Sequence, residues 1–419
     1  MTDKRTNGSG KPFLAFPSGT VYTEDSNERV FNIQMTEYLP ERAGTLSSVW
    51  QKKMKNTHGK GRAEMAKSEL NIYRIAEEAG VSPSTVSRVM TQNARVSEEK
   101  RRRVEEVIRK YDYRPNALAQ GLASPKTKVI GLLSSDLMNP YYAQLLTECE
   151  HEIDRLGYYP MIFSPMNSYD LEVRYLQKMF DMRVDAIIMM GGKSDQLVTD
   201  PAYADLINRL GESVPIITTG KVEGARCWQV SIDEMSGVDL AMEHLFSLGH
   251  RHIAMIGGRN HVKSTYVKRM RYRTILRSHG ITFRERYLPE SDYDIEGGYQ
   301  CMNRLFETNR TMPTAVMAIN DFSAVGVMRS VKERGLRIPE DMAIVSFDNT
   351  FLVDTVMPRL TSICYDYKGF GETLADTAAK LINGESVPEV QKISSRLIVR
   401  NSTVKSAPDP NWGETRQRE

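Results

Sequence analysis

From residue 128 onward, short apolar runs alternate with longer segments in which apolar residues recur every three or four positions. Apolar runs that recur about every 30 residues, with amphipathic helical patterns between them, are typical of parallel β-α-β units. Strands that are buried on both faces lose the polar alternation, so the runs are continuous. Seven runs predict strands, namely VIGLL (129–133), YPMIFS (159–164), AIIMM (186–190), VPIITT (214–219), HIAMIGG (252–258), AVMAIN (315–320) and MAIVSFD (342–348).

Helical patterns fill the intervals between these runs. Tyr142–Leu156, Gly237–Leu248 and Phe322–Arg334 each place their apolar residues on one face, and a glycine follows each of them. We therefore expect a doubly wound α/β body over residues 128–404. Because roughly 275 residues are many for one sheet, two similar lobes are the more economical arrangement. The cleft between two such lobes is the default ligand site.

The sequence NIYRIAEEAGVSPSTVSRVM, which begins at Asn71, predicts a helix, a tight turn and a second helix. Gly80 breaks the first helix, and Ser82 can cap the second helix with Pro83 in its first turn. Val86 and Val89 face inward on the second helix, which leaves short polar side chains and one arginine outside. The inward face of the first helix carries Ile72, Ile75, Ala76 and Ala79.

The outward face of the second helix has the chemistry that a major groove requires. Short polar side chains at a helix N-terminus can reach base edges, and the Arg88 guanidinium can bind guanine O6 and N7 together. An ordinary structural hairpin is the alternative. The candidate DNA contacts of this module are Ser82, Pro83, Ser84, Thr85, Ser87, Arg88, Asn93 and Arg95.

Charge favours the DNA-binding interpretation. Residues 67–128 contain 13 Lys and Arg against 8 Asp and Glu, a local surplus that suits phosphate binding. The run KRRR (100–103) opens a third helix, whose Val104, Val107 and Ile108 should pack inward, although such a run can also be a solvated face. Ser97 can cap this helix and present backbone N–H groups to a phosphate.

The segment between Pro115 and Pro125 predicts a short conditional helix. About nine residues are too few for a stable helix in water, and Gly121 costs a further ~1 kcal/mol relative to Ala. Such a helix should become ordered only against a partner, and Leu122 could wedge between base pairs from the minor groove. An ordinary interdomain linker is the alternative.

The composition excludes several classes of protein. The 419 residues carry 56 Lys and Arg against 53 Asp and Glu, and 40% are hydrophobic, which excludes wholesale disorder. Four widely spaced cysteines without a CxxC pair argue against a disulfide framework or a zinc cluster and indicate a reducing cytosol. No apolar leader or run of about 18 apolar residues occurs, so we expect a cytoplasmic protein without a membrane span.

Residues 1–66 show no sustained period of 2 or 3.6 and are expected to be largely disordered. Clear periodicity begins near Met65, which raises the hypothesis that translation naturally starts there; a native extension is the alternative. Sequencing the natural N-terminus distinguishes the two.

Enzymatic motifs are absent from the sequence. No GxGxxG follows a predicted strand, and neither GxxxxGK[ST], GxSxG nor HExxH occurs. We therefore expect no catalytic residues, no metal and no cofactor. A soluble binding protein or an enzyme on the same two-lobed body is the alternative, but it leaves the N-terminal module unexplained.

Three stretches together, IAEEAGVSPSTVSRVM, RVSEEKRRRVEEVIRKYDYRPNALAQGLA and IGLL, resemble the lactose-repressor/galactose-repressor family of bacterial transcriptional regulators over residues 70–404. The resemblance implies a helix-turn-helix headpiece (70–114), a hinge helix and linker (115–127) and a periplasmic-binding-protein-like core (128–404). Its lobes would be about 128–228 with 358–386, and about 231–355 with 390–404, followed by a tail at 405–419. The resemblance also implies a repressor that binds a palindromic DNA operator as a homodimer under control of a small, sugar-like effector.

The resemblance assigns roles to individual residues. On the hinge helix it points to Asn116, Ala119 and Gln120, with Leu122 matching the intercalating leucine. Strand ends in open α/β sheets bind ligands, which fits Asn320 and Asp348. Where relatives carry an arginine, this chain has Lys268, so either Lys268 or Arg269 reaches the cleft; lysine is a point donor and not a planar fork. The expected effector contacts are Tyr141, Tyr142, Lys268, Arg269, Tyr293, Asn320 and Asp348.

Overall fold

The computed structural model describes residues 71–90, 96–111, 113, 126–308 and 311–406, and the backbone of three short strands near the N-terminus. The chain divides into two compact units between Pro115 and Asn116. The N-terminal strands β1 (Arg5–Thr6), β2 (Pro12–Ala15) and β3 (Val21–Tyr22) pair antiparallel. These strands comprise two to four residues each, and the expected disorder of residues 1–66 stays a prediction. The rest of that segment lies outside the described residues.

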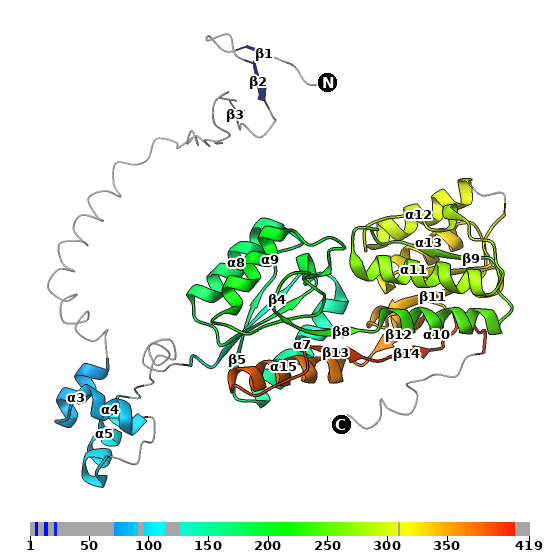
Figure 1. Cartoon of the computed structure of the whole chain (residues 1–419). Coiled ribbons are helices and arrows are strands. Elements are labelled where there is room, and N and C mark those ends of the chain that lie inside the picture. The colour runs from blue at the N-terminus through cyan, green and yellow to red at the C-terminus, as the bar shows by residue number, and fades with distance from the viewer. Residues whose placement is uncertain are drawn as a thin grey trace. The chain divides into compact units, whose positions relative to one another are not determined.

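Three helices form the headpiece, as the sequence predicts (Figure 1). They are α3 (Ile72–Ala79), α4 (Pro83–Met90) and α5 (Glu98–Lys110). The Asn71 side chain caps α3 by accepting from the N–H groups of Tyr73 and Arg74, both at 3.1 Å. Gly80 ends α3 with a left-handed φ of 63°, a conformation that side chains with a Cβ rarely adopt. The headpiece core contains Ile75, Ala76, Ala79, Val86, Val89, Val96, Val104 and Val107.

Lobe 1 of the second unit is a six-stranded parallel sheet in the order β13-β8-β7-β6-β4-β5. Adjacent residues of β6 pack into different clusters on its two faces: Ile187 lies with α8 and α9, and Ile188 lies with α7 and α15. The strands are β4 (Val129–Ser134), β5 (Tyr159–Phe163), β6 (Ala186–Met190), β7 (Ile216–Thr218), β8 (Trp228–Ile232) and β13 (Val390–Ile393). The helices are α7 (Pro140–Arg155), α8 (Tyr169–Asp181), η1 (Gly192–Asp195), α9 (Pro201–Gly211) and α15 (Tyr367–Ile382).

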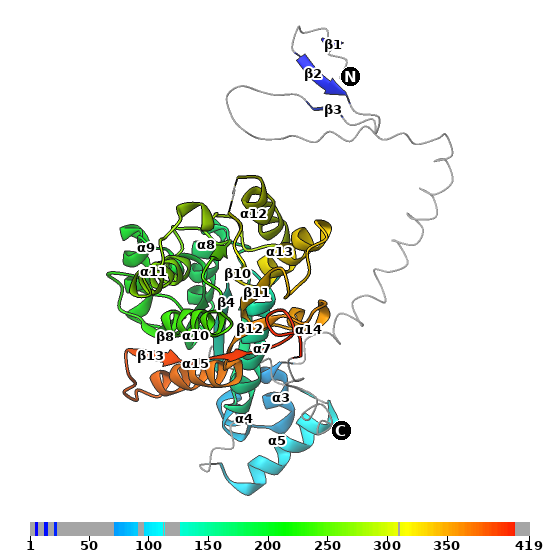
Figure 2. The ribbon, with the colours of Figure 1, turned by 90° about the vertical axis from the view of Figure 1, so that its right-hand side faces the viewer.

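Lobe 2 has five strands in the order β14-β12-β11-β10-β9, of which only β14 runs antiparallel to its neighbour (Figures 1 and 2). Helices cover both faces of this sheet as well. The strands are β9 (Ile253–Ile256), β10 (Ala315–Ala318), β11 (Ala343–Asp348), β12 (Thr361–Tyr365) and β14 (Ser395–Ile398). The helices are α10 (Glu234–Ser247), α11 (Lys263–Ser278), η2 (Glu285–Tyr287), α12 (Ile295–Thr308), α13 (Asp321–Glu333) and α14 (Leu352–Thr355).

The structure contains all seven predicted strands and corrects the expected lobe boundaries. Residues 358–386 were expected in lobe 1, yet β12 pairs with β11 of lobe 2. Residues 390–404 were expected in lobe 2, yet β13 pairs with β8 of lobe 1. β8 itself runs to Ile232 in lobe 1 and so extends past the expected end at 228. The reason is that a strand's partner is chosen by tertiary pairing, which a local apolar pattern does not record.

Candidate functional site

The N-terminus of α4 presents the predicted DNA-contact side chains. Ser82, Ser84 and Arg88 are exposed, whereas Pro83, Thr85 and Ser87 are half-buried. The Ser82 hydroxyl caps the helix by accepting from the Thr85 N–H at 3.3 Å, and it lies 2.8 Å from the Ser84 hydroxyl. This local network orders the hydroxyl groups at the start of the helix, where base edges would be read.

The third helix differs from its prediction in one detail. Ser97 occupies the N-cap position of α5, but its side chain makes no capping hydrogen bond. In the KRRR run, Lys100 and Arg102 are exposed, while Arg101 and Arg103 are partly buried. Val104 and Val107 are buried as expected, and Ile108 packs against them.

Six predicted DNA contacts lie outside the described residues. They are Asn93 and Arg95 after α4, and Asn116, Ala119, Gln120 and Leu122 in the predicted hinge.

A cavity of about 920 Å³ lies between the lobes of the core. Side chains at the carboxyl ends of strands in both lobes line it, which is where open α/β sheets bind ligands. Of the predicted effector contacts, six line this cavity: Tyr141, Tyr142, Lys268, Tyr293, Asn320 and Asp348.

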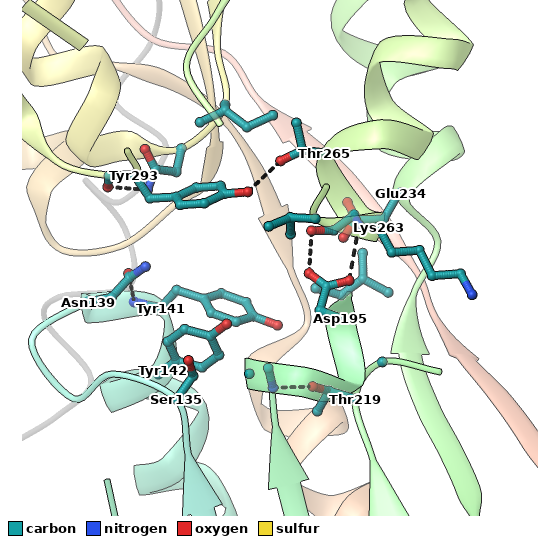
Figure 3. Close-up of a pocket in the computed structure, with 18 of the residues that line it drawn as sticks. Ser135, Asn139, Tyr141, Tyr142, Asp195, Thr219, Glu234, Lys263, Thr265 and Tyr293 are labelled. Carbon is teal, nitrogen blue, oxygen red and sulfur yellow. Dashed lines mark hydrogen bonds between the residues drawn. The ribbon is translucent and has the colours of Figure 1, made fainter. Parts of the chain in front are cut away.

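Aromatic side chains form one wall of the cavity (Figure 3). Asn139 caps α7 by accepting from the Tyr141 N–H at 3.1 Å, and this places two tyrosines at the helix start. The rings of Tyr141 and Tyr142 meet edge to face with centroids 4.9 Å apart, and Tyr365 of β12 lies 6.0 Å from Tyr141. Burial raises the pKa of all three phenols, so their hydroxyl groups stay protonated and can donate to a ligand.

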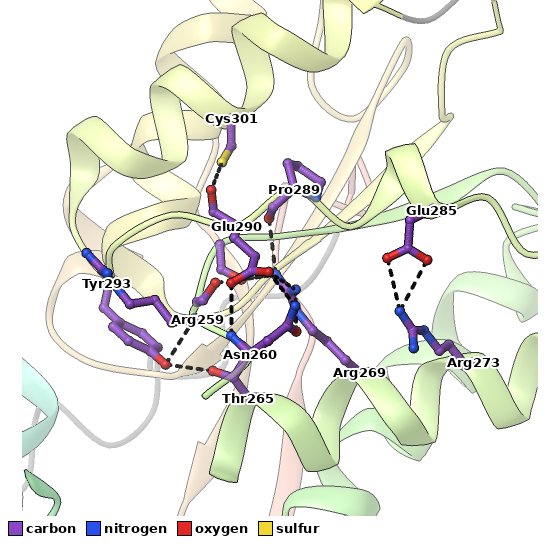
Figure 4. Close-up of polar contacts among 12 residues, drawn as sticks. Arg259, Asn260, Thr265, Arg269, Arg273, Glu285, Pro289, Glu290, Tyr293 and Cys301 are labelled. Carbon is purple, nitrogen blue, oxygen red and sulfur yellow. Dashed lines mark hydrogen bonds and ion pairs between the residues drawn. The ribbon is translucent and has the colours of Figure 1, made fainter. Parts of the chain in front are cut away.

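Lys268 reaches the cavity and Arg269 does not. The Lys268 Nζ lies 2.7 Å from the Glu234 carboxylate and 5.0 Å from the centroid of the Phe347 ring. The Arg269 guanidinium instead donates to the carbonyl groups of Gly257 (3.0 Å) and Pro289 (3.2 Å) and to Asn260 Oδ1 (2.8 Å) (Figure 4). The expectation that Arg269 binds the effector is therefore corrected, because the loops behind the cleft use its donors.

Asn320 and Tyr293 form a connected pair. The Asn320 side chain caps α13 by accepting from the Ser323 N–H at 2.9 Å, and its amide donates to the Tyr293 carbonyl at 2.9 Å. The Tyr293 hydroxyl lies 2.7 Å from the Thr265 hydroxyl. The Asn320 amide thus links the start of α13 to the segment that carries Tyr293.

Asp348 ends β11 in a left-handed conformation with φ of 100°. Its side chain lines the cavity and is 8% exposed, and its backbone carbonyl accepts from the Tyr367 hydroxyl of lobe 1 at 3.0 Å. Burial, together with the nearby Asp321 carboxylate, raises the pKa of Asp348 well above its ordinary value. Asp348 therefore places a carboxyl group directly at the ligand space.

Asp195 joins the two lobes. It follows β6 in lobe 1, and its carboxylate accepts from the Ser264 N–H at 3.0 Å and from the Ser264 hydroxyl at 2.6 Å in lobe 2 (Figure 3). These bonds cap α11, whose own N-cap residue Val262 supplies no side-chain bond. The Leu197 N–H donates to the His261 carbonyl at 2.8 Å beside this contact.

Sequence reasoning missed Asp195 and Glu234. Glu234 follows β8, whose sequence WQVSI is not a continuous apolar run and was not predicted as a strand. Asp195 comes five residues after β6, beyond the strand end at which candidates were sought. The acidic pair Asp233 and Glu234 after a short strand was the available signal.

Comparisons with known proteins show which family this chain belongs to. Residues 71–116 match the family described as bacterial regulatory proteins, lacI family, and residues 242–403 match the periplasmic binding protein-like domain. Catabolite control protein A of Priestia megaterium is 32% identical over 337 residues, which cover 80% of this chain and 99% of that protein. The chain belongs to the lacI family of bacterial regulatory proteins. It is a DNA-binding transcriptional regulator and not an enzyme, as the sequence predicts.

Two solved lacI-family structures extend the comparison. A Lac repressor dimer bound to operator and the anti-inducer ONPF matches with a TM-score of 0.72 and 27% identity, over 80% of this chain and 99% of that chain. A lacI-family regulator from Enterococcus faecium with bound ribose matches with a TM-score of 0.57 and 26% identity, over 66% of this chain and 98% of that chain. Among the described residues, no helix is long and apolar enough to cross a membrane.

Proposed function

We propose that this lacI-family regulator represses transcription in the cytoplasm as a homodimer on a palindromic operator, and that a small polar, sugar-like metabolite controls its operator affinity. The Lac repressor structure, a dimer on operator DNA, and the ribose complex of the Enterococcus faecium regulator support this proposal. The effector contacts are Tyr141, Tyr142, Lys268, Tyr293 and Asp348.

One observation carries the proposal. The same chain holds a helix-turn-helix with exposed polar side chains at the start of α4, and a core whose two lobes enclose a cavity of about 920 Å³. A ligand that contacts both lobes stabilises one lobe arrangement over another. It changes DNA affinity only by its differential affinity for the two arrangements. The predicted hinge (115–127), which includes Asn116, Ala119, Gln120 and Leu122, would pass this change to the headpiece.

Arg88→Ala tests the DNA-reading role. An operator is first selected from a random duplex library with the full chain, and affinity is then measured by fluorescence anisotropy. Loss of a bidentate base contact should cost about 1–3 kcal/mol and relax the preference at one base position. The matched control is Arg109→Ala, which removes the same charge at the far end of α5, where the side chain bonds to the Glu105 carbonyl.

The sequence dependence and the salt dependence of Arg88→Ala binding separate a base contact from a phosphate contact. If Arg88→Ala weakens binding to every sequence equally and reduces the salt dependence by about one unit of slope, Arg88 contacts a phosphate instead. A full chain that selects no sequence from the library would contradict the proposed function itself.

A further inference from the structure

The inner wall of the cleft carries more carboxyl groups than ammonium groups. Three carboxyl groups, those of Asp195, Glu234 and Asp348, line it together with one ammonium group, that of Lys268. Lys268 and Asp348 are both more than nine-tenths buried. Burial raises the pKa of Asp195 to about 6 and the pKa of Asp348 well above its ordinary value, so each carboxyl group gives up its proton more readily when a cation lies beside it.

The partners of these groups show which charge is left over. Lys268 is paired with Glu234 at 2.7 Å. Asp195 accepts two hydrogen bonds from Ser264, which is a neutral partner. Asp348 is 8% exposed, and within the described part of the chain its carboxylate accepts no hydrogen bond. Asp348 therefore lines the cavity with a carboxyl group to which no side chain or backbone group of the described residues donates.

The other lysines and the arginine along the cavity each contact a different partner. Arg259 pairs with Asp292, and Lys263 and Lys221 both pair with Glu223. Lys193 lies over the Tyr169 ring at 4.1 Å, and Lys392 donates to the Ser231 hydroxyl at 3.0 Å. None of these contacts involves Asp348. His261 completes the basic residues of the lining.

A bound cation would satisfy this arrangement. A buried carboxylate without a partner is costly, and an opposite charge within hydrogen-bonding distance removes most of that cost. The tyrosine wall adds a second attraction, because aromatic rings attract positively charged nitrogen and both Tyr141 and Tyr365 line the cavity. An anionic ligand would meet three carboxyl groups around Lys268, whose ammonium group is already paired with Glu234.

We propose that the effector carries a protonated amine on a polyhydroxylated frame, as an amino sugar does, and that this amine binds the Asp348 carboxylate. The hydroxyl groups of the frame would use the tyrosine hydroxyls and the Asp195 and Glu234 carboxylates. This inference rests on the proposed function, in which the cleft binds the effector, and adds the charge of the ligand.

A charge-matched panel tests the proposal with the full chain. Thermal shift and isothermal calorimetry are run with D-glucosamine, D-galactosamine and D-mannosamine. Each is compared with its neutral parent sugar, its N-acetyl derivative and its 6-phosphate, with magnesium chloride as a separate arm. We expect at least one amine to bind, and to bind at least tenfold more tightly than its neutral and anionic counterparts. If no amine in the panel binds, or if a neutral sugar, a sugar phosphate or magnesium alone binds better, the proposal is wrong.

Asp348→Asn then tests the residue. It keeps the size of the side chain, and asparagine tolerates a positive φ, so the fold should be retained. The variant should lose the preference for the amine over the neutral sugar at least tenfold. The matched control is Asp341→Asn, which removes the same charge outside the cavity, where the carboxylate is paired with Arg337. It should keep the preference, and equal losses in the two variants would contradict a specific role for Asp348.

The outcome is separable from that of the proposed function. Operator selection and anisotropy report DNA binding without any ligand. A neutral sugar that binds and changes operator affinity would leave the proposed function standing and overturn only the amine.

Discussion

At the scale of single residues, the ligand-facing end of β11 depends on Asp321, a fully buried carboxyl group that does not line the cavity. Asp348 and Asn349 both have positive φ, at 100° and 54°, which costs backbone energy in residues with a Cβ. Asp321 accepts hydrogen bonds from the residues on both sides of this turn. The donors are the Ser346 hydroxyl (2.5 Å), the Thr350 N–H (2.6 Å), the Thr350 hydroxyl (2.9 Å) and the Ser362 hydroxyl (2.9 Å).

Asp321→Ala should therefore destabilise the core. It removes the acceptor that four buried donors share, and we expect the free energy of unfolding in urea to fall by about 3 kcal/mol. Asp321→Asn retains one acceptor oxygen and should lose less. The control Asp341→Ala removes a surface carboxylate that is paired with Arg337, and it should change little. Equal stability of Asp321→Ala and wild type would show that the turn holds its conformation without Asp321.

The sequence predicted some of the residues that line the cleft and left others undecided. Asp348 was found because it follows a predicted strand, whereas Tyr141, Tyr142 and Tyr293 were expected only from the resemblance to the lactose-repressor/galactose-repressor family. The choice between Lys268 and Arg269 needed the structure, because adjacent helix residues point in different directions and only coordinates fix which one faces the cavity. Whether these side chains bind an effector stays a prediction.

At the scale of elements, continuous apolar strands were predictable and mixed ones were not. β6 and β11 are buried along their whole length and consist largely of apolar residues. β13 (VQKI) and β14 (SRLI) lie at sheet edges, are only partly buried and carry polar residues, so no apolar run marks them. β12 (TSICY) is fully buried, but hydrogen bonds satisfy its Thr361 and Ser362 side chains. A strand whose polar residues are hydrogen-bonded in the core has no continuous apolar run, so hydropathy does not predict it.

The hinge segment supports a prediction at the same scale. Residues 115–125 of the hinge lie outside the described residues. About nine residues with a central glycine form no stable helix alone. Leu122→Ala removes the proposed wedge and should weaken operator binding at least tenfold, while calorimetry shows unchanged effector binding. Leu118→Ala, a leucine deletion in the same segment, is the control. Unchanged operator affinity of Leu122→Ala would refute the wedge.

At the scale of the whole molecule, Asp195 makes the contact between the lobes depend on pH. The pKa of Asp195 is raised from an ordinary 3.8 to about 6, mainly by burial and also by Glu234, while Ser264 and Lys268 act in the opposite direction. The folded chain therefore binds this proton more tightly than the unfolded chain does. The contribution of Asp195 to the free energy of unfolding is largest at low pH and falls as pH rises through about 6.

Asp195→Asn is the variant that isolates this contribution, because it keeps the shape and stays neutral. The stability of wild type relative to the variant should fall by about 1 kcal/mol between pH 5 and pH 7.5. Urea unfolding of both proteins across that range measures this difference in free energy of unfolding. The contributions of the other titrating groups are common to both proteins and cancel. A difference that does not change with pH would show that Asp195 has an ordinary pKa in the folded chain.

The path of the chain between the lobes has a consequence for the gene. The polypeptide crosses after β8, after β12 and again between β13 and β14, so residues 390–398 complete both sheets. Neither lobe is encoded by one uninterrupted stretch of codons. A premature stop shortly before codon 390 would leave most of the reading frame intact, yet it would strip an edge strand from each half of the core at once.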